Sequence, residues 1–219
     1  MTISKEISDA YGKLSTSTVS DALDKLGVSG GCLGISPVVN SLKMVGTAYT
    51  VHYVPTGYVK GTVGDYIDDV QPGQVIVLDN NGRMDCTVWG DILTMTSSLK
   101  GISGTVIDGV CRDVDGIRAY EYPVFSRGKF MMTGKDRVMV DAVGWTVSIG
   151  NVQVRQDDLL MGDDSGVIVV PSAMIESVLE TATDIDQAEQ GIMEAVKSGL
   201  SISEARKKFA YHSLQTKAQ

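Results

Sequence analysis

Three ionisable residues in the middle of the chain are the strongest candidates for chemistry. Asp91 lies in the segment Trp89-Gly-Asp-Ile-Leu93, and the pair Arg112-Asp113 follows after twenty intervening residues. An aspartate is a hard oxygen ligand, and Mg²⁺ needs only one or two protein carboxylates because it keeps several water molecules. An arginine is a permanent, forked cation that binds a carboxylate or a developing enolate oxygen. Asp91, Arg112 and Asp113 together therefore suit a divalent metal ion and a small anionic substrate.

The elements around these residues predict that they meet in space. The pattern alternates strands and helices over 74–79 (strand), 91–100 (helix), 105–108 (strand), 113–120 (short helix) and 123–125 (strand). Short joints between such elements favour parallel βαβ units, and open α/β sheets bind ligands beyond the carboxyl ends of their strands. A helix that begins at Asp91 also presents free backbone amides at Ile92 and Leu93, which suit a carboxylate. We therefore expect a clamp for a 2-oxo acid at this edge.

The remaining segments complete an α/β protein. Two helices are predicted near the N-terminus, from apolar residues at helical spacing and a Ser/Thr cluster at 15–18, and a strand is predicted over 47–54. Short strands split by turn residues follow at 137–140, 146–149, 152–154, 159–161 and 167–170, and they suggest an antiparallel or mixed layer. A long helix opens at Pro171 and continues to about Ser198, and a last short helix covers 201–210. No linker divides the chain, so we expect one domain over 1–219.

Composition excludes several classes of function. The chain has 219 residues, 43% of them hydrophobic, and a net charge of −8 without a basic run, which argues against a nucleic-acid partner. Three cysteines without a Cys-x-x-Cys spacing favour a reducing compartment over a disulfide or zinc framework. No apolar stretch has the ~18 residues of a membrane span. Glu6 and Asp9 stand where a signal peptide would be apolar. We therefore expect a cytoplasmic protein with no membrane partner.

The sequence alone also allows structural roles for these residues and for other candidate residues. The spacing of Asp91 and Arg112-Asp113 is weak evidence by itself, because an Arg-Asp pair at a helix start is often only a cap and a surface ion pair. The histidines, His52 and His212, favour packed or solvated roles over catalytic ones. Groups that could bind a second substrate carboxylate are basic loop residues, which usually only solvate a surface: Arg127, Lys135 and Arg137.

A longer stretch of sequence is more specific than this spacing. The sequence closely resembles the RraA-like family in the run Trp89-Gly-Asp and in its continuation Lys100-Gly-Ile-Ser-Gly-Thr-Val-Ile-Asp-Gly-Val-Cys-Arg-Asp-Val-Asp-Gly-Ile117. This family includes the class II pyruvate aldolases of the 4-hydroxy-4-methyl-2-oxoglutarate/4-carboxy-4-hydroxy-2-oxoadipate type. Further segments resemble the family over most of the chain: 19–24, 45–51, 123–125, 164–171 and the C-terminal helix.

The resemblance implies a fold and an assembly. The fold is the swivelling β/β/α fold, here expected with a parallel βαβ core, a mixed β layer and a long C-terminal helix. The family forms trimers or dimers of trimers with active sites between subunits, so a homotrimer or homohexamer is implied. Its aldolases use a divalent ion, usually Mg²⁺ or Mn²⁺, and they also decarboxylate oxaloacetate through the same pyruvate enolate.

The family's functional residues are carried over position by position. The direct metal ligand falls on Asp113, the arginine that contacts the keto oxygen on Arg112, and the aspartate that holds a metal-bound water on Asp91. Substrate binding falls on Gly90 and Arg112 and on the backbone amides of Ile92 and Leu93, which bind the pyruvyl carboxylate. A glutamate from a neighbouring subunit, acting on the metal through water, falls on Glu189, with Glu194 as its competitor.

Two functions from different classes follow from the resemblance. The presence of Asp91, Arg112 and Asp113 favours an enzyme, a metal-dependent carbon–carbon lyase that cleaves a 4-hydroxy-2-oxo acid by a retro-aldol reaction and releases pyruvate. Other members of the family lack the aldolase carboxylates and regulate an RNA-degrading endonuclease by binding it. A third reading is a relative that acts on an unrelated sugar acid or lactone.

Overall fold

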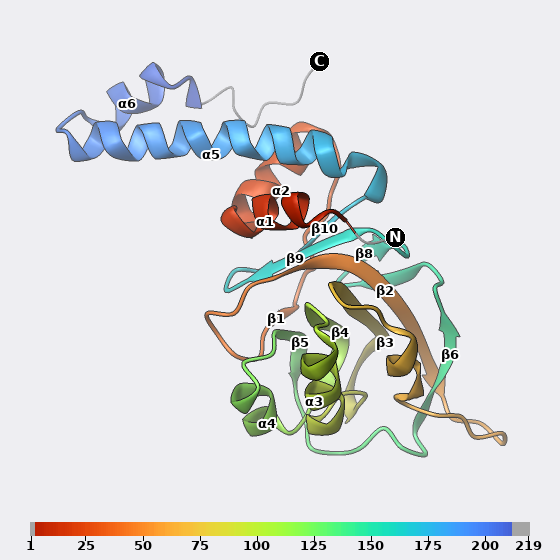
Figure 1. The fold of residues 1–219 in the computed structure, drawn as a ribbon. Coiled ribbons are helices and arrows are strands. Elements are labelled where there is room, and N and C mark those ends of the chain that lie inside the picture. The colour runs from red at the N-terminus through yellow and green to blue at the C-terminus, as the bar shows by residue number, and fades with distance from the viewer. Residues whose placement is uncertain (1–2, 212–219) are drawn as a thin grey trace.

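A mixed β-sheet with helices on its faces forms the framework of the protein. The computed structural model describes residues 3–211. The strands are β1 (Ser36–Pro37), β2 (Met44–Pro55), β3 (Gln74–Thr87), β4 (Gly104–Cys111), β5 (Val124–Lys129), β6 (Val138–Val143), β9 (Leu159–Asp163) and β10 (Gly166–Val170). They are ordered β1-β5-β4-β3-β2-β9-β10, and β6 also pairs with β2 (Figure 1).

The centre of this sheet confirms the predicted parallel βαβ core. Strand β3 pairs in parallel with β4, and β4 pairs in parallel with β5. Helix α3 (Asp91–Lys100) connects β3 to β4, and helix α4 (Val114–Ala119) connects β4 to β5. Both helices therefore begin beyond the carboxyl ends of neighbouring parallel strands, where the sequence places Asp91 and Asp113.

Strand β3 runs past the predicted end of the strand at residue 79, because the turn-forming residues Asn80-Asn-Gly82 do not end it. Asn81 and Gly82 have positive φ angles of 53° and 66°, and the pairing with β4 shifts register on either side of Arg83. The Asn81 side-chain amide donates a hydrogen bond of 2.9 Å to the Tyr53 carbonyl on β2, which keeps the kinked segment attached to the sheet. The turn residues thus produce a bulge, which bends a strand without reversing it.

The predicted mixed layer is present, and most of it belongs to the same sheet. Strands β9 and β10 pair antiparallel with each other, and β6 and β9 both pair antiparallel with β2. A separate hairpin of β7 (Val147–Ile149) and β8 (Val152–Val154) covers one face. Because side chains alternate along a strand, residues such as Val75 and Val77 pack toward this hairpin, whereas Ile76 and Leu78 pack toward α3 and α4.

Helices cover the β9–β10 end of the sheet. Helices α1 (Lys5–Lys13) and α2 (Thr16–Lys25) lie between the sheet and the long helix α5 (Ile175–Lys197), and short α6 (Ile202–Lys208) folds back on it (Figure 1). The long C-terminal helix is confirmed, but it begins at Ile175, after the 3-10 turn η2 (Ser172–Met174). A second such turn, η1 (Asp65–Asp69), was not predicted. Within residues 3–211, no helix combines the length and apolar character needed to cross a membrane.

The contact between α3 and α4 allows a stability test. A Cβ built on Gly116 of α4 would lie 2.9 Å from the Asp91 Cβ of α3, whereas one on Gly12 of α1 would meet nothing within 4 Å. We expect Gly116→Ala to lower the free energy of unfolding by about 1–3 kcal/mol through overpacking. The matched Gly12→Ala should raise it by roughly 0.5–1 kcal/mol, because alanine favours a helix. Urea denaturation of both variants measures these opposite signs, and equal effects would contradict the close packing of the two helices.

Candidate functional site

Trp89 holds the two halves of the candidate site together. Its indole is buried, stacks on Tyr122 with ring centroids 6.2 Å apart, and donates from Nε1 to the Thr94 hydroxyl at 2.9 Å. Its carbonyl accepts a 3.0 Å hydrogen bond from the backbone amide of Arg112. Because Gly90, the residue after Trp89, caps α3, this bond fixes the N-terminus of that helix against the turn that carries Arg112 and Asp113.

The structure brings Asp91, Arg112 and Asp113 together, as the sequence predicts. Asp113 Oδ2 lies 3.1 Å from Arg112 Nε and accepts a long hydrogen bond of 3.4 Å from the Asp91 backbone amide. Asp113 has φ 54° and ψ 45°, in the left-handed region that few residues other than glycine adopt. Both ionic side chains are a little over one-third exposed. The pair is therefore open to a ligand.

Gly90 is required by the closeness of these groups. A Cβ at position 90 would lie 2.6 Å from Asp113 Oδ2 and 3.4 Å from Arg112 Nε. The backbone of Gly90 is extended, with φ −152°, so any residue could adopt its conformation. Space for the Asp113 carboxylate, and not backbone freedom, therefore explains the glycine.

The predicted amide donors are only partly available. Ile92 and Leu93 lie in the first turn of α3, where backbone amides have no acceptor within the helix. The Ile92 amide, however, donates a 2.8 Å hydrogen bond to Asp91 Oδ1. A substrate carboxylate could use this amide only if the Asp91 side chain turned away from it.

A small cavity lies in front of these groups. Its volume is about 240 Å³, and it is lined by Gly90, Asp91, Ile92, Leu93 and Arg112, together with residues of β3 and of the loops at 63–64 and 133. A second cavity of about 280 Å³ shares Arg112 and is lined by Asp113 and Lys129. Such volumes suit a substrate of a few carbon atoms.

The donor set fits a hydrated divalent ion more than a fully ligated one. Within residues 3–211, no group of three His, Cys, Asp or Glu side chains is arranged to hold a metal. Asp91 and Asp113 offer two carboxylates, and each keeps one oxygen that accepts no hydrogen bond from the residues described. Two carboxylates and several waters are a common set for Mg²⁺, so these residues fit the predicted cofactor.

Glu189 does not join this group within one chain. It lies on α5, which packs over α1 and α2, far from α3 and α4 (Figure 1). Partial burial raises its pKa, and the negative charges of Asp21 and Asp186 raise it further. Glu194 lies on the same helix. The prediction that one of these residues reaches a neighbouring subunit's site therefore stays a prediction.

Arg127, one of the basic residues considered for a second carboxylate, has a different role. It forms an ion pair with the buried Asp108, donating from Nε to Oδ1 and from Nη2 to Oδ2, the latter at 3.1 Å. Asp108 also accepts a 2.8 Å hydrogen bond from the Gly150 amide. Besides Arg112, Lys129 also lines a cavity at the site, although the sequence pattern did not single it out. Only its position at the end of β5, beside β4 and Arg112, could have indicated it.

Comparisons with known proteins agree with the motif analysis. The RraA-like family model, described as Aldolase/RraA, matches residues 16–169. Protein DlpA of Legionella pneumophila is 42% identical over 88% of this chain, but the chain spans only 32% of that protein's length. A protein of Halalkalibacterium halodurans named "Putative 4-hydroxy-4-methyl-2-oxoglutarate aldolase" is 32% identical over 85% of this chain and 88% of its own. The crystal structure of an uncharacterized protein from Pseudomonas syringae pv. tomato has a TM-score of 0.86 and 42% identity, covering 93% of this chain and 98% of that one.

The environment of Glu189 predicts a pH-dependent stability. Its pKa is raised on folding, so the folded state disfavours the charged carboxylate, and stability present below the ordinary glutamate pKa is lost as the pH rises. Glu189→Gln should therefore unfold at higher temperature than the parent at pH 7, with the difference vanishing in acid. Glu180→Gln, on the exposed side of the same helix, is the control. Thermal unfolding between pH 4 and 8 measures the effect, and a Glu189→Gln variant less stable than the parent at pH 7 would contradict it.

Proposed function

The chain belongs to the RraA-like family, and we propose that it is a divalent-metal-dependent lyase that cleaves a 4-hydroxy-2-oxo acid and releases pyruvate. One observation carries the proposal: Asp91, Arg112 and Asp113 meet at the N-terminus of α3, where Asp91 and Arg112 line one small cavity and Arg112 and Asp113 line a second. The name of the relative from Halalkalibacterium halodurans supports the same reaction. Decarboxylation of oxaloacetate is proposed as a side activity, because it passes through the same enolate.

Hydrogen-bond donors and positive charges orient the negatively charged substrate. The first-turn amides of α3 and the positive end of its dipole receive the carboxylate of the 2-oxo acid. Arg112 then lies beside the oxo group, where its forked cation stabilises the negative charge that develops on this oxygen when the C3–C4 bond breaks. The cavity of about 240 Å³ holds the pyruvyl half of the substrate.

Asp113 and Asp91 would hold Mg²⁺ or Mn²⁺, Asp113 directly and Asp91 through water. When bound, the ion supplies Lewis acidity at the oxo and carboxylate oxygens. Asp91 is also the group toward which the proton of the C4 hydroxyl moves through water. Loss of that proton lets the C4–O bond become a carbonyl while the electrons of the C3–C4 bond pass to the enolate, which is then protonated at C3.

The proposed site needs a partner subunit only for its last group. A Glu189 or Glu194 side chain from a neighbouring α5 would complete the hydration shell of the ion in a homotrimer or homohexamer. The proposal for a soluble, cytoplasmic enzyme with a small 2-oxo acid as its substrate does not depend on that residue, because Asp91, Arg112 and Asp113 all come from one chain.

The test of the proposed reaction is pyruvate release coupled to a dehydrogenase, with oxaloacetate and 4-hydroxy-4-methyl-2-oxoglutarate as substrates. We expect turnover that a chelator abolishes and added Mg²⁺ or Mn²⁺ restores. Asp113→Ala and Arg112→Ala should each lower kcat by about 10²–10³-fold, the loss typical of one electrostatic group at a developing oxyanion. Arg112→Lys should restore little of it, because lysine has no fork.

Asp115→Ala is the matched control for the carboxylate. Asp115 lies two residues from Asp113, is almost fully exposed and pairs only with Arg118 in the described part of the chain. It should keep the parent's kcat. Parent-like turnover in Asp113→Ala would refute the site. Metal-dependent turnover of a sugar acid without pyruvate from any 2-oxo acid would select the third function named above. A purified protein that turns over none of these compounds and captures an endonuclease would select the regulatory one.

Gly90→Ala tests the space reserved for the Asp113 carboxylate. The added Cβ would lie only 2.6 Å from Asp113 Oδ2. It would therefore displace the carboxylate, without straining the extended backbone. We expect kcat to fall by at least tenfold, while the melting temperature changes by less than about 4 °C, the shift from roughly 1 kcal/mol. Gly57→Ala, where a Cβ meets nothing within 4 Å, should change neither quantity. Full activity in Gly90→Ala would show that Asp113 has no fixed role.

A further inference from the structure

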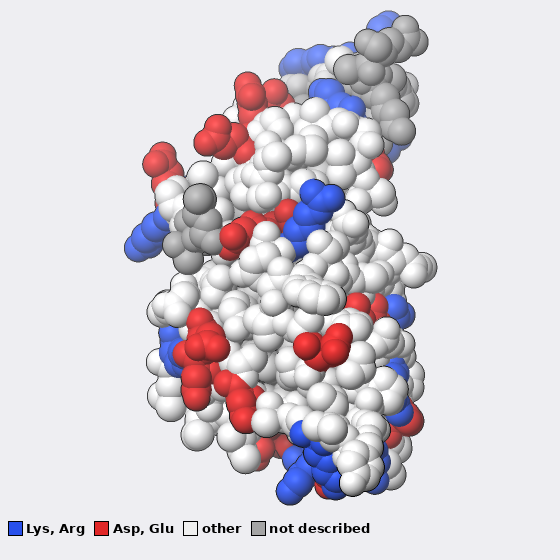
Figure 2. Space-filling view, turned by 90° about the vertical axis from the view of Figure 1, so that its right-hand side faces the viewer, with Lys and Arg blue, Asp and Glu red and all other residues white. Residues whose placement is uncertain are grey.

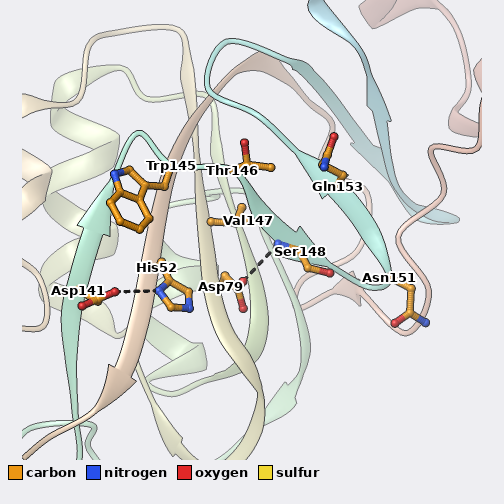
Figure 3. Close-up of a pocket in the computed structure, with 9 residues that line it drawn as sticks. All are labelled: His52, Asp79, Asp141, Trp145, Thr146, Val147, Ser148, Asn151 and Gln153. Atoms are coloured by element: carbon orange, nitrogen blue, oxygen red, sulfur yellow. Dashed lines mark hydrogen bonds and ion pairs between the residues drawn. The ribbon is translucent and has the colours of Figure 1, made fainter.

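A larger cavity lies on the opposite face of the sheet from the candidate lyase site. Its volume is about 570 Å³, within the range of small-molecule sites, which hold roughly 300–1,000 Å³. Its lining residues come from strands β2, β3 and β6 and from the segment from Trp145 to Gln153 (Figure 3). His52 and Asp79 alternate along their strands with residues that face α3, so they point to the hairpin side. The cavity is therefore separate from Asp91 and Arg112.

Polar groups on three neighbouring strands form the floor of this cavity. His52 and Asp79 are direct neighbours in the parallel register of β2 and β3. Asp79 is almost completely buried, and its two carboxylate oxygens accept backbone hydrogen bonds from Asn81 at 2.9 Å and Ser148 at 3.2 Å. His52 Nδ1 lies 3.3 Å from Asp141 Oδ2 of β6, so Asp141 fixes the orientation of the ring (Figure 3). These bonds hold the Asp79 carboxylate in a fixed position, and the half-exposed Asp141 carboxylate lies beside His52.

Trp145 adds an aromatic surface to the same cavity. Its side chain is exposed (67% of the residue's surface), although its carbonyl accepts a 2.7 Å hydrogen bond from the buried Thr50 hydroxyl, and the preceding Gly144 amide donates to the Thr50 carbonyl at 2.9 Å. The backbone is therefore anchored while the indole remains open to solvent. Figure 3 shows the indole on the side of the cavity that also carries Asp141 and His52.

The charge of the lining selects the class of ligand. Asp79 and Asp141 line the cavity, and neither Lys nor Arg does. Figure 2 shows acidic side chains over the middle of the face that carries β6, with basic side chains at its lower end, along one edge and in its upper part. An anion would be repelled here. Two carboxylates beside an indole face instead favour an organic cation, because the ring quadrupole attracts cations and prefers weakly hydrated ones.

We propose that this cavity is a second ligand site, which binds an organic cation through Trp145, Asp141 and Asp79. The ligand is an ammonium or guanidinium group that rests on the indole face and pairs with the carboxylates. The exposed indole of Trp145 distinguishes this cavity from the candidate lyase site, and an aromatic face suits an organic cation better than a strongly hydrated metal ion. The cation has two possible sources, a free small molecule or the Lys or Arg side chain of a protein.

The fluorescence of Trp145 gives a direct test. The chain contains two tryptophans, and Trp89 is buried, so quenching by a ligand reports on Trp145. We expect choline to bind at least tenfold more tightly than 3,3-dimethyl-1-butanol, its neutral isostere. Asp141→Asn and Trp145→Ala should each weaken choline binding at least tenfold by calorimetry. Asp184→Asn, which removes an exposed charge from α5, should leave it unchanged.

Parallel measurements show whether the cation comes from a small molecule or from a protein, and they also test whether the cavity binds a cation at all. N-acetylarginine amide replaces choline as the probe of a protein side chain, and sedimentation compares the mass of the parent with that of Asp141→Asn. Preference for the arginine probe, or a lower mass in Asp141→Asn, assigns the cation to a protein. Preference for choline without a change in mass assigns it to a small molecule. Three results would each overturn the proposal. The first is equal binding of the neutral isostere, and the second is binding of glucose, a neutral sugar, that Asp141→Asn leaves intact. The third is that a correctly folded protein binds neither cation.

Discussion

The hydrogen bond between the Trp89 carbonyl and the Arg112 amide is the contact on which the candidate lyase site depends. It joins the end of β3 to the end of β4 at the point where both chains leave the sheet. The Trp89 indole is buried between the sheet and α3, and its bond to Thr94 fixes the first turn of that helix. Asp113 is consequently delivered to the N-terminus of α3 by backbone geometry. A flexible side chain alone would give no such precision, because ordering it costs conformational entropy.

Once these segments meet, electrostatics orders the ionic groups. One oxygen of Asp113 is shared between the Arg112 guanidinium and the Asp91 amide. The same arrangement reserves the α3 N-terminus for negative charge, which the helix dipole favours. In the structure, Asp91 itself takes the Ile92 amide. An entering substrate carboxylate therefore competes with the Asp91 side chain for the Ile92 amide. Once displaced from this amide, the Asp91 carboxylate would be free for the proton transfer proposed above.

The sequence predicted the parallel core well because its signals are local. The apolar stripe of 91–100 and the short strands before and after it match α3, β3 and β4, and the positions of Asp91 and Asp113 follow from that topology. Contacts between distant residues could not be read in the same way. Asn81 and Gly82 have the composition of a turn, and only the bond from Asn81 to Tyr53 on another strand keeps them in β3. Arg127 forms an ion pair with Asp108, which is 19 residues away in the sequence. The position of His52 within a predicted strand favours a packed or solvated role, and the sequence does not reveal its neighbours Asp79 and Asp141, which come from separate strands.

The charge balance of the candidate lyase site affects how an anionic substrate would bind. Asp91 and Asp113 carry two negative charges and Arg112 carries one positive charge, in a chain whose net charge is −8. A dianionic 2-oxo acid would approach this site against net repulsion, although the first turn of α3 attracts its carboxylate at short range. A divalent cation reverses the balance, because it adds two positive charges beside the two aspartates. In the proposed reaction a bound divalent ion would therefore offset the repulsion from Asp91 and Asp113, and the affinity for a dianionic substrate should depend on the ion more steeply than that for a monoanionic one.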